Sequence, residues 1–275
     1  MEILEIIKAI ILGIVEGITE WLPISSTGHM ILVDEILKLN MSDRFIEMFL
    51  VVIQLGAILA VVILFWKDII PLKTKPKLAL KTETLEMWAK IIVACVPGAI
   101  IGVFFDDAIN ALFYNYLSVS IALVVFGILF IVIENRNRGK TPHINSISGI
   151  TYKTAMMIGV FQLIAAVFPG TSRSGATILG GILIGMSRTV AAEFTFYLAI
   201  PVMTGASLLK ILKFGFSFSG LELAVLAAGT LVAFIVSIFV IKFLMTYIKK
   251  HDFKVFGWYR IVLGCIVVMY FLLKG

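Results

Sequence analysis

Long apolar segments, separated by short polar loops, run through most of this chain. A transmembrane helix needs about 20 consecutive apolar residues. Six segments approach or exceed that length: 45–66, 88–105, 117–133, 189–210, 221–247 and 255–273. Three further apolar stretches, near 3–15, 154–168 and 176–185, are too short to cross a bilayer. The pattern therefore predicts six transmembrane helices and three shorter helices that do not span.

The short stretches adjoin two polar segments that are rich in glycine, proline and hydroxyl residues. One polar segment covers residues 23–28 and the other covers residues 169–175. Non-helical backbone at membrane depth is tolerated only where protein encloses it or a water-filled cavity receives it. We therefore predict two re-entrant helical hairpins, over 1–35 and 154–185, each returning to the side of the membrane from which it enters.

The composition supports a membrane protein and excludes several other classes. Of the 275 residues, 60% are hydrophobic and 15% are charged, and the mean hydropathy is +1.07. An average soluble domain has about 25% charged residues, and even a large one buries only about 75% of its surface. A soluble enzyme, a secreted disulfide scaffold and a disordered chain are therefore excluded.

The positive charge gathers in three loops between the predicted spans. Loops 67–87, 134–153 and 248–254 are basic, whereas loop 106–116 carries Asp106 and Asp107 and no basic residue. Cytoplasmic loops of membrane proteins are enriched in lysine and arginine, so we predict the basic loops inside and both termini outside the cytoplasm. The net charge of +6 then reflects topology, and the expected surroundings are a lipid bilayer, with no nucleic acid partner.

Five residue pairs at one separation indicate an internal repeat. Each pair is 146 positions apart: Gly13/Gly159, Glu16/Gln162, Pro23/Pro169, Ser26/Ser172 and Glu47/Glu193. Each half then holds a hairpin and three spans, and this odd number requires the second half to be inverted in the membrane. The predicted fold is all-α, a single membrane domain over 1–275 with inverted repeats over 1–140 and 141–275.

The first hairpin concentrates acidic, hydroxyl and imidazole side chains. Glu16 and Glu20 are four residues apart, so they share one face of a helix and repel each other unless a proton or a metal ion lies between them. Ser26 and His29 follow within nine residues of Glu20. A helix end exposed to lipid headgroups is the plain alternative, but ionisable residues inside membranes are usually functional.

The second hairpin supplies the opposite charge. Its loop combines Gly170, which permits close approach of the backbone, with the hydroxyls of Thr171, Ser172 and Ser174 and the guanidinium of Arg173. Such donors at the start of a helix are typical of a phosphate site. The loop has no lysine and no preceding strand, so ATP is not expected. The alternative is that Arg173 snorkels to the interface, which the repeat disfavours because it brings this loop to the acidic residues.

Together the hairpins predict phosphoryl transfer from an anionic lipid. Ser26 or His29 would attack phosphorus, and Glu20 would orient or deprotonate the attacking group. Arg173 would neutralise charge that develops on the transferred group. Glu16 and Glu20 would alternatively hold Mg²⁺ or Ca²⁺ between two phosphates. The residues alone leave these roles open.

The strings EGITEWLPISSTGH at 16–29 and PGTSRSGAT at 169–177 resemble the two motif regions of the bacterial undecaprenyl-pyrophosphate phosphatase family, the bacitracin-resistance type. YIKKHDF and YRIVLG near the C-terminus are also similar, so the resemblance covers essentially the whole chain. It implies hydrolysis of undecaprenyl pyrophosphate in the bacterial plasma membrane, which recycles the carrier lipid of peptidoglycan synthesis. It further implies an extracytoplasmic active site and a divalent metal. The family's motif residues fall on Glu16, Glu20, Ser25, Ser26, Thr27, His29, Ser172, Arg173 and Ser174.

Two other functions compete with this one. A transporter or flippase of polyprenyl phosphate would use the same inverted-repeat architecture and the same arginine, but it would not need Ser26 and His29 beside paired carboxylates. The type 2 phosphatidic acid phosphatases also carry a Ser-Gly-His string, but their further arginine-rich motif and second histidine are lacking at suitable positions. The expected partner is a polyprenyl pyrophosphate lipid, and the oligomeric state, a homodimer included, is left open.

Overall fold

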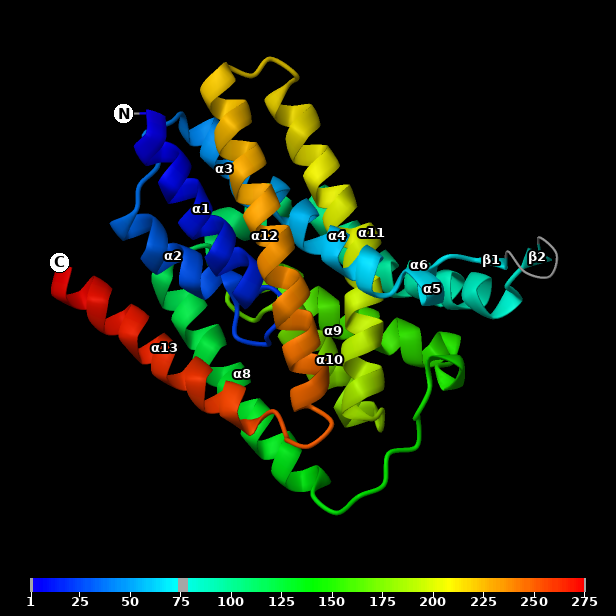
Figure 1. Cartoon of the computed structure of the whole chain (residues 1–275). Coiled ribbons are helices and arrows are strands. Elements are labelled where there is room, and N and C mark those ends of the chain that lie inside the picture. The colour runs from blue at the N-terminus through cyan, green and yellow to red at the C-terminus, as the bar shows by residue number, and fades with distance from the viewer. Residues whose placement is uncertain (1, 74–78, 275) are drawn as a thin grey trace.

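The computed structural model describes residues 2–73 and 79–274, which form a bundle of helices with mostly short connections (Figure 1). The helices are α1 (Glu2–Thr19), α2 (Ser26–Ile36), α3 (Asp43–Val52), α4 (Gln54–Leu64), α5 (Trp66–Ile69), α6 (Thr82–Phe104), α7 (Asp106–Phe113), α8 (Tyr116–Asn137), η1 (Ile147–Gly149), α9 (Tyr152–Val167), α10 (Arg173–Ile184), α11 (Arg188–Phe214), α12 (Gly220–Tyr247) and α13 (Lys254–Lys274). Two strands, β1 (Leu72–Lys73) and β2 (Ala79–Leu80), pair antiparallel. Lys75 and Lys77 of the first basic loop lie outside the described residues.

Within the described residues, six helical segments are long and apolar enough to cross a membrane, which confirms the six predicted spans. They are Asp43–Leu64, Thr82–Phe104, Tyr116–Asn137, Arg188–Phe214, Gly220–Tyr247 and Lys254–Lys274. The first consists of α3 and α4, which follow one another with Ile53 between them. The chain is therefore an all-α, multi-pass integral membrane protein.

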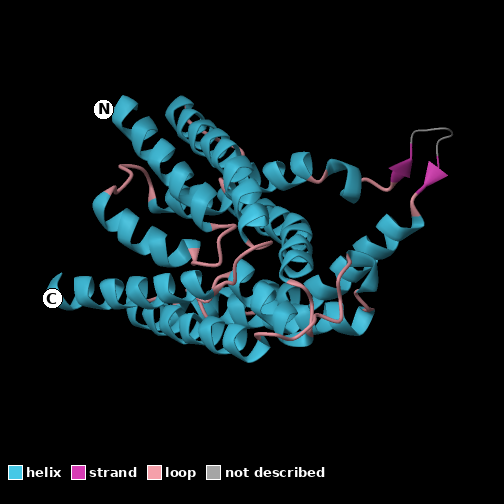
Figure 2. Ribbon diagram, turned by 60° about the horizontal axis from the view of Figure 1, so that its bottom comes forward, coloured by secondary structure: helices cyan, strands magenta, loops and turns pink. Residues whose placement is uncertain are grey.

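The remaining apolar helices form two pairs, each joined by a short loop. Residues 20–25 join α1 to α2, and residues 168–172 join α9 to α10. Figures 1 and 2 show both connecting loops inside the bundle rather than at its ends. The helix α1 is longer than the apolar stretch 3–15 because it continues through Glu16 to Thr19. The two loops are thus held at the centre of the molecule, with a helix entering and leaving each.

Each pair packs its first helix against a span of the other half at small residues. The helix α1 lies along α12, where a Cβ on Gly13 would lie 2.5 Å from the carbonyl oxygen of Gly229. The helix α9 lies along α6, where a Cβ on Gly159 would lie 2.5 Å from the carbonyl oxygen of Ala94. Small residues at helix contacts in membranes permit such close backbone approach. Gly13 and Gly159 therefore have the same packing role in their two halves.

Two short elements differ from the predicted loops. The segment 106–113 forms α7, and β1 pairs with β2 inside the loop predicted over 67–87. Phe113, at the end of α7, packs edge-on against Phe168 at 5.1 Å between ring centres. Contacts of this kind stabilise short elements that local sequence patterns do not reveal.

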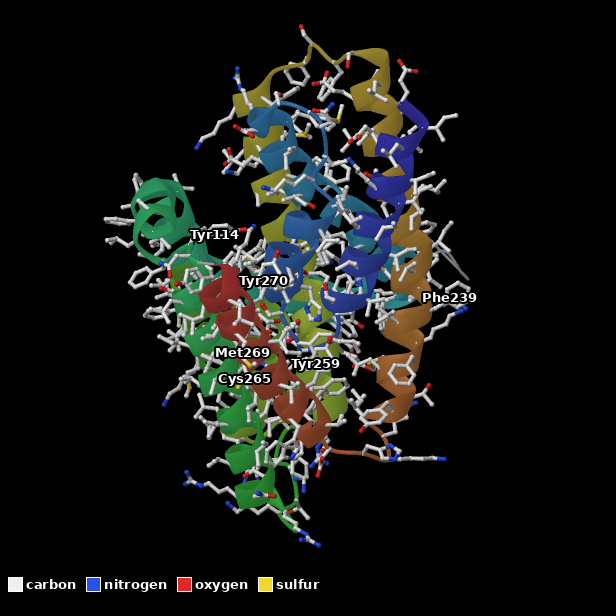
Figure 3. All side chains as sticks on the ribbon, turned by 90° about the vertical axis from the view of Figure 1, so that its left-hand side faces the viewer. Tyr114, Phe239, Tyr259, Cys265, Met269 and Tyr270 are labelled. Atoms are coloured by element: carbon white, nitrogen blue, oxygen red, sulfur yellow. The ribbon has the colours of Figure 1, made fainter. Side chains whose placement is uncertain are left out.

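The interior is apolar around the loops, and the outer surface is apolar as well. Trp21 is fully buried and meets Phe196 edge-on at 5.3 Å. On the outside, Phe239 and Met269 point away from the bundle (Figure 3) and are 69% and 60% exposed. Large exposed apolar side chains are expected where lipid tails are the solvent. The loops inside the bundle, by contrast, combine burial with several polar side chains, among them Glu20, Ser25 and Thr171.

Candidate active site

Both central loops end on a serine with the same unusual backbone. Ser25 has φ 76° and Ser172 has φ 70°, and they are the only described non-glycine residues with positive φ. Ser25 Oγ accepts from the Gly28 amide at 3.3 Å, and Ser172 Oγ accepts from the Gly175 amide at 3.1 Å, so each serine caps the following helix. Strained backbone of this kind clusters at functional sites.

The caps show which residues of the two loops correspond in structure. The spacing of 146 predicts that Ser26 corresponds to Ser172. The structure instead pairs Ser25 with Ser172, which are 147 positions apart, because these two serines are the helix caps. The second loop has one more residue between its proline and its cap. Consequently Ser26 and Arg173 occupy the same place, the first residue of α2 and of α10.

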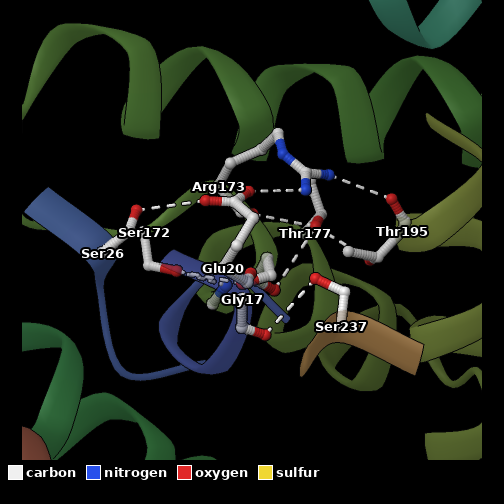
Figure 4. Close-up of polar contacts among 10 residues, drawn as sticks. Gly17, Glu20, Ser26, Ser172, Arg173, Thr177, Thr195 and Ser237 are labelled. Carbon is white, nitrogen blue, oxygen red and sulfur yellow. Dashed lines mark hydrogen bonds and ion pairs between the residues drawn. The ribbon is translucent and has the colours of Figure 1, made fainter. Parts of the chain in front are cut away.

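These two first residues bind one carboxylate, that of Glu20. Ser26 Oγ donates to Glu20 Oε2 at 3.1 Å, and the Arg173 guanidinium donates to Glu20 Oε1 at 2.9 Å (Figure 4). Ser174 Oγ also donates to the backbone oxygen of Glu20 at 2.9 Å. The structure therefore brings together three of the four predicted catalytic residues at the junction of α1, α2 and α10.

Arg173 is held inside the protein and does not snorkel to an interface. Its side chain is 12% exposed, and besides Glu20 it donates to the backbone oxygen of Thr195 at 3.0 Å. Its guanidinium lies 5.9 Å from the ring centre of Trp21. Thr195 in turn donates to Thr177 Oγ1 at 2.8 Å, which ties α11 to α10 behind the arginine (Figure 4).

Glu16 is buried one turn before Glu20. Its side chain is 1% exposed, and its Oε1 has no hydrogen-bond partner in the described structure. Burial, reinforced by the neighbouring Glu20 carboxylate, raises the pKa of Glu16 well above its ordinary value of 4.5. A buried carboxyl in this position takes a proton or a cation.

The fourth predicted catalytic residue, His29, binds elsewhere. Its Nδ1 lies 2.7 Å from the backbone oxygen of Ser25, and its Nε2 lies 2.7 Å from the Tyr259 hydroxyl, with the two rings stacked. Nδ1 faces a carbonyl and so carries the proton, which leaves Nε2 to accept from Tyr259. Burial lowers the pKa of His29 below its ordinary value of 6.5. No described hydrogen bond joins His29 to Glu20, Ser26 or Arg173.

Some of the predicted substrate-binding residues stabilise the loops, and others have hydroxyl groups without a hydrogen-bond partner. Ser172 Oγ also lies 3.1 Å from Ser174 Oγ, so both serines are engaged inside the second loop. Gly170 has φ +92°, and a Cβ there would lie 2.6 Å from the Val119 carbonyl oxygen, so this position requires glycine. The Thr27 hydroxyl forms no side-chain hydrogen bond to another described residue, and the buried Thr171 hydroxyl has no partner either.

Buried polar atoms without partners gather around these loops. The described structure contains six: Glu16 Oε1, Trp21 Nε1, Gln162 Oε1, Thr171 Oγ1, Arg173 Nε and Arg260 Nε. Nearly all buried polar groups in proteins are hydrogen-bonded. All six belong to the two helix pairs or to α13, so this is the part of the molecule with polar atoms to spare for a ligand.

Two residues of α13 contact the site but were not predicted from the sequences of the two hairpins. Tyr259 contacts His29, and the adjacent Arg260 is fully buried and donates to backbone oxygens of both loops. The string YRIVLG that contains them carried a resemblance but no role. The sequence signal that could have identified them is Arg260 itself, an arginine inside an otherwise apolar span.

Comparison with known proteins gives one consistent result. The family described as bacitracin resistance protein BacA matches residues 9–266. The undecaprenyl-diphosphatase of Desulfitobacterium hafniense is 69% identical over 271 residues, covering 98% of both chains. Undecaprenyl-diphosphatase 1 of Clostridium acetobutylicum is 66% identical over 99% of this chain and all of its own, and an undecaprenyl-diphosphatase of Enterococcus faecalis is 60% identical over 98% of both chains.

Proposed function

The chain belongs to the bacitracin resistance protein BacA family, and from that membership we infer that it is an undecaprenyl-diphosphatase. It is a membrane hydrolase that converts undecaprenyl pyrophosphate into undecaprenyl phosphate and phosphate. The observation that carries this function is the identity of 56–69% to undecaprenyl-diphosphatases over nearly the whole chain. The family description names bacitracin resistance, and the activity would serve cell wall synthesis by recycling its carrier lipid.

For the reaction itself, Ser26 is the nucleophile that the geometry favours. Its hydroxyl already donates to Glu20, and a nucleophile beside a general base is the arrangement that hydroxyl catalysis requires. As Ser26 Oγ attacks the terminal phosphorus, Glu20 takes its proton and undecaprenyl phosphate leaves. Water then cleaves the phosphoserine, which releases phosphate and restores the hydroxyl. Both nitrogens of His29 are engaged by Ser25 and Tyr259, which suits a supporting role.

Charge on the phosphates is balanced by the second loop. The guanidinium of Arg173 reaches Glu20, and its unpartnered Nε and the Thr171 hydroxyl supply donors for phosphate oxygens. Preorganised donors aimed at developing charge are a major source of transition-state stabilisation. The start of α10 also presents backbone N–H groups, which favour a bound anion at a helix N-terminus.

A divalent cation fits the acidic side of the site. Glu16 and Glu20 are the residues that would hold it, and the unpartnered Glu16 Oε1 is a suitable oxygen ligand. The described residues contain no cluster of three or more acidic, histidine or cysteine side chains. Mg²⁺ commonly binds through one or two carboxylates together with substrate phosphates. When bound, it would supply charge neutralisation for the pyrophosphate.

The architecture we propose is an inverted repeat with two re-entrant hairpins, open to the extracytoplasmic side. The matched caps at Ser25 and Ser172, and the matched glycine contacts of α1 and α9, support it. Loops 138–146 and 248–253 lie at the end of the bundle opposite loop 215–219 and the N-terminus (Figure 1). Two of the three basic loops thus lie at one end, which supports a cytoplasmic location for that end.

The test is phosphate release from a short isoprenyl pyrophosphate by the purified protein in detergent, with and without EDTA. Ser26→Ala and Arg173→Ala should each lose at least about a hundredfold in kcat/KM. The matched controls Ser148→Ala and Arg138→Ala, both at exposed positions, should retain wild-type rates. Absence of release by the wild-type protein with Mg²⁺ or Ca²⁺ would refute the hydrolase. Movement of labelled polyprenyl phosphate without hydrolysis would favour a flippase instead.

A further inference from the structure

One guanidinium joins the two central loops. Arg260 projects from α13 and is fully buried. It donates to the backbone oxygen of Pro23 at 3.3 Å, and to those of Gly170 and Thr171 at 2.9 and 2.8 Å. Pro23 belongs to the loop between α1 and α2, and the other two residues belong to the loop between α9 and α10. The rigid fork of an arginine therefore fixes the distance between the loops.

The charge of Arg260 has no acidic partner. None of the ion pairs among the described residues includes Arg260. Its guanidinium carbon lies 5.8 Å from the centre of the Phe126 ring, which is a cation–π contact. Isolated buried charges are costly and seldom retained without a role. Carbonyl dipoles and an aromatic face are here the only compensation that the described structure gives this arginine.

The bonds of Arg260 lie beside the groups that the reaction uses. Pro23 stands three residues from both Glu20 and Ser26, and Thr171 stands two residues before Arg173. A movement of one loop relative to the other would separate the Ser26–Glu20 pair from the guanidinium of Arg173. Gly175 leaves room for this arrangement, since a Cβ there would lie 3.1 Å from the Arg260 guanidinium.

We propose that Arg260 is a positioning residue for pyrophosphate hydrolysis: it holds the two loops at the separation at which Glu20 meets both Ser26 and Arg173. The inference rests on the proposed function for the reaction that it serves. It assigns to α13 a part in the active site, although α13 contributes no side chain to the Glu20–Ser26–Arg173 cluster.

The substitution Arg260→Lys tests this proposal. Lysine keeps the positive charge but lacks the planar fork that spans both loops. We expect kcat to fall at least about tenfold, since small displacements of reacting groups have effects of this size, with KM within about twofold, in a variant that remains folded in detergent. Arg188→Lys is the matched control, because Arg188 joins α11 to Glu134 of α8 outside the site; its kcat should stay at the wild-type value.

A readout independent of activity is the fluorescence of Trp21. Trp66, Trp88 and Trp258 are changed to phenylalanine, so that the buried Trp21 beside Arg173 is the only emitter. We expect Arg260→Lys to shift its emission to the red, as the loops part and water enters, and Arg188→Lys to leave it unchanged.

The outcomes separate the proposals. A folded Arg260→Lys protein with wild-type kcat and wild-type Trp21 emission would overturn the positioning role. A failure of this variant to fold would also overturn it, because Arg260 would then serve the stability of the whole protein. If the wild-type protein releases no phosphate, the proposed function fails. A Trp21 shift confined to Arg260→Lys would still show that this residue sets the loop separation.

Discussion

Single residues at the ends of the two loops bear most of the strain in this site. Ser25 and Ser172 each combine a left-handed backbone with a capping hydroxyl. Alanine would keep the strain and lose the cap, whereas asparagine tolerates the left-handed region and can also cap. The serine at each position is thus suited by its side-chain oxygen, not by its backbone preference.

Ser172→Ala should therefore destabilise the protein by about 1 kcal/mol or more, and Ser172→Asn should be less destabilising. Thermal unfolding of the purified variants in detergent measures the difference. The exposed Ser148 provides the control, because Ser148→Ala removes no helix cap. Equal melting temperatures for Ser172→Ala and Ser172→Asn would contradict this account of the loop.

The protonation state of His29 predicts how kcat changes with pH on the acid side. Its pKa is lowered chiefly by burial and further by the charge of Arg260, and Tyr259 is the other polar group of α13 that faces it. The imidazole therefore stays neutral at neutral pH and gains its proton only below its ordinary value of 6.5. If neutral His29 supports the reaction, the acid limb of the kcat profile lies below pH 6.5.

Tyr259→Phe tests that arrangement. It removes the donor to Nε2, a bond that favours the neutral imidazole, so the acid limb should move to higher pH. Tyr152→Phe, at an exposed tyrosine of α9, is the control that should leave the profile in place. An unshifted profile in Tyr259→Phe would mean that this hydroxyl does not act through His29.

At the scale of elements, the close contact between α8 and α13 determines how Arg260 is positioned relative to the two central loops. A Cβ on Gly127 would lie 2.7 Å from the Gly257 carbonyl oxygen, and a Cβ on Gly257 would lie 2.7 Å from that of Gly127. Gly257 lies one turn before Arg260. A side chain at this crossing must push the helices apart and carry Arg260 away from the loops.

Gly257→Ala should therefore cost about 1–3 kcal/mol of stability, as overpacking usually does, and should lower kcat as well. Gly205→Ala in α11 is the matched control, because a Cβ at Gly205 would have no neighbour within 4 Å. The two variants are compared by thermal unfolding and by phosphate release. If Gly257→Ala behaves like Gly205→Ala, the crossing is looser than the structure indicates.

The elements also show what the sequence could and could not reveal. Six long spans follow from apolar length alone, because the bilayer requires that length of each of them. The cluster of Glu20, Ser26 and Arg173 was likewise predictable, since charged and hydroxyl residues stand out in apolar surroundings. The contacts of His29 with Tyr259, and of Arg260 with both loops, join residues more than 80 positions apart, and only the packing of α13 brings these together.

On the scale of the whole molecule, the sequence predicts an orientation that labelling can test. Cys95 and Cys265 are first replaced by alanine, and single cysteines are then placed at Ser217 and at Lys140. In intact cells, a membrane-impermeant maleimide should react at position 217 and should reach position 140 only after lysis. Because loop 215–219 and loop 138–146 lie at opposite ends (Figure 1), the reverse result would invert the proposed topology.

The shared carboxylate of Glu20 has a consequence for how the enzyme rests between turnovers. With Arg173 on one oxygen and Ser26 on the other, the charges of the acid and the arginine neutralise each other. On the proposed function, a pyrophosphate entering the site would compete with Glu20 for Arg173, and the carboxylate that it displaces would keep only its bond to Ser26. Binding of the substrate would thus be coupled to release of the base that Ser26 needs, and departure of the less charged phosphate product would let Glu20 pair with Arg173 again.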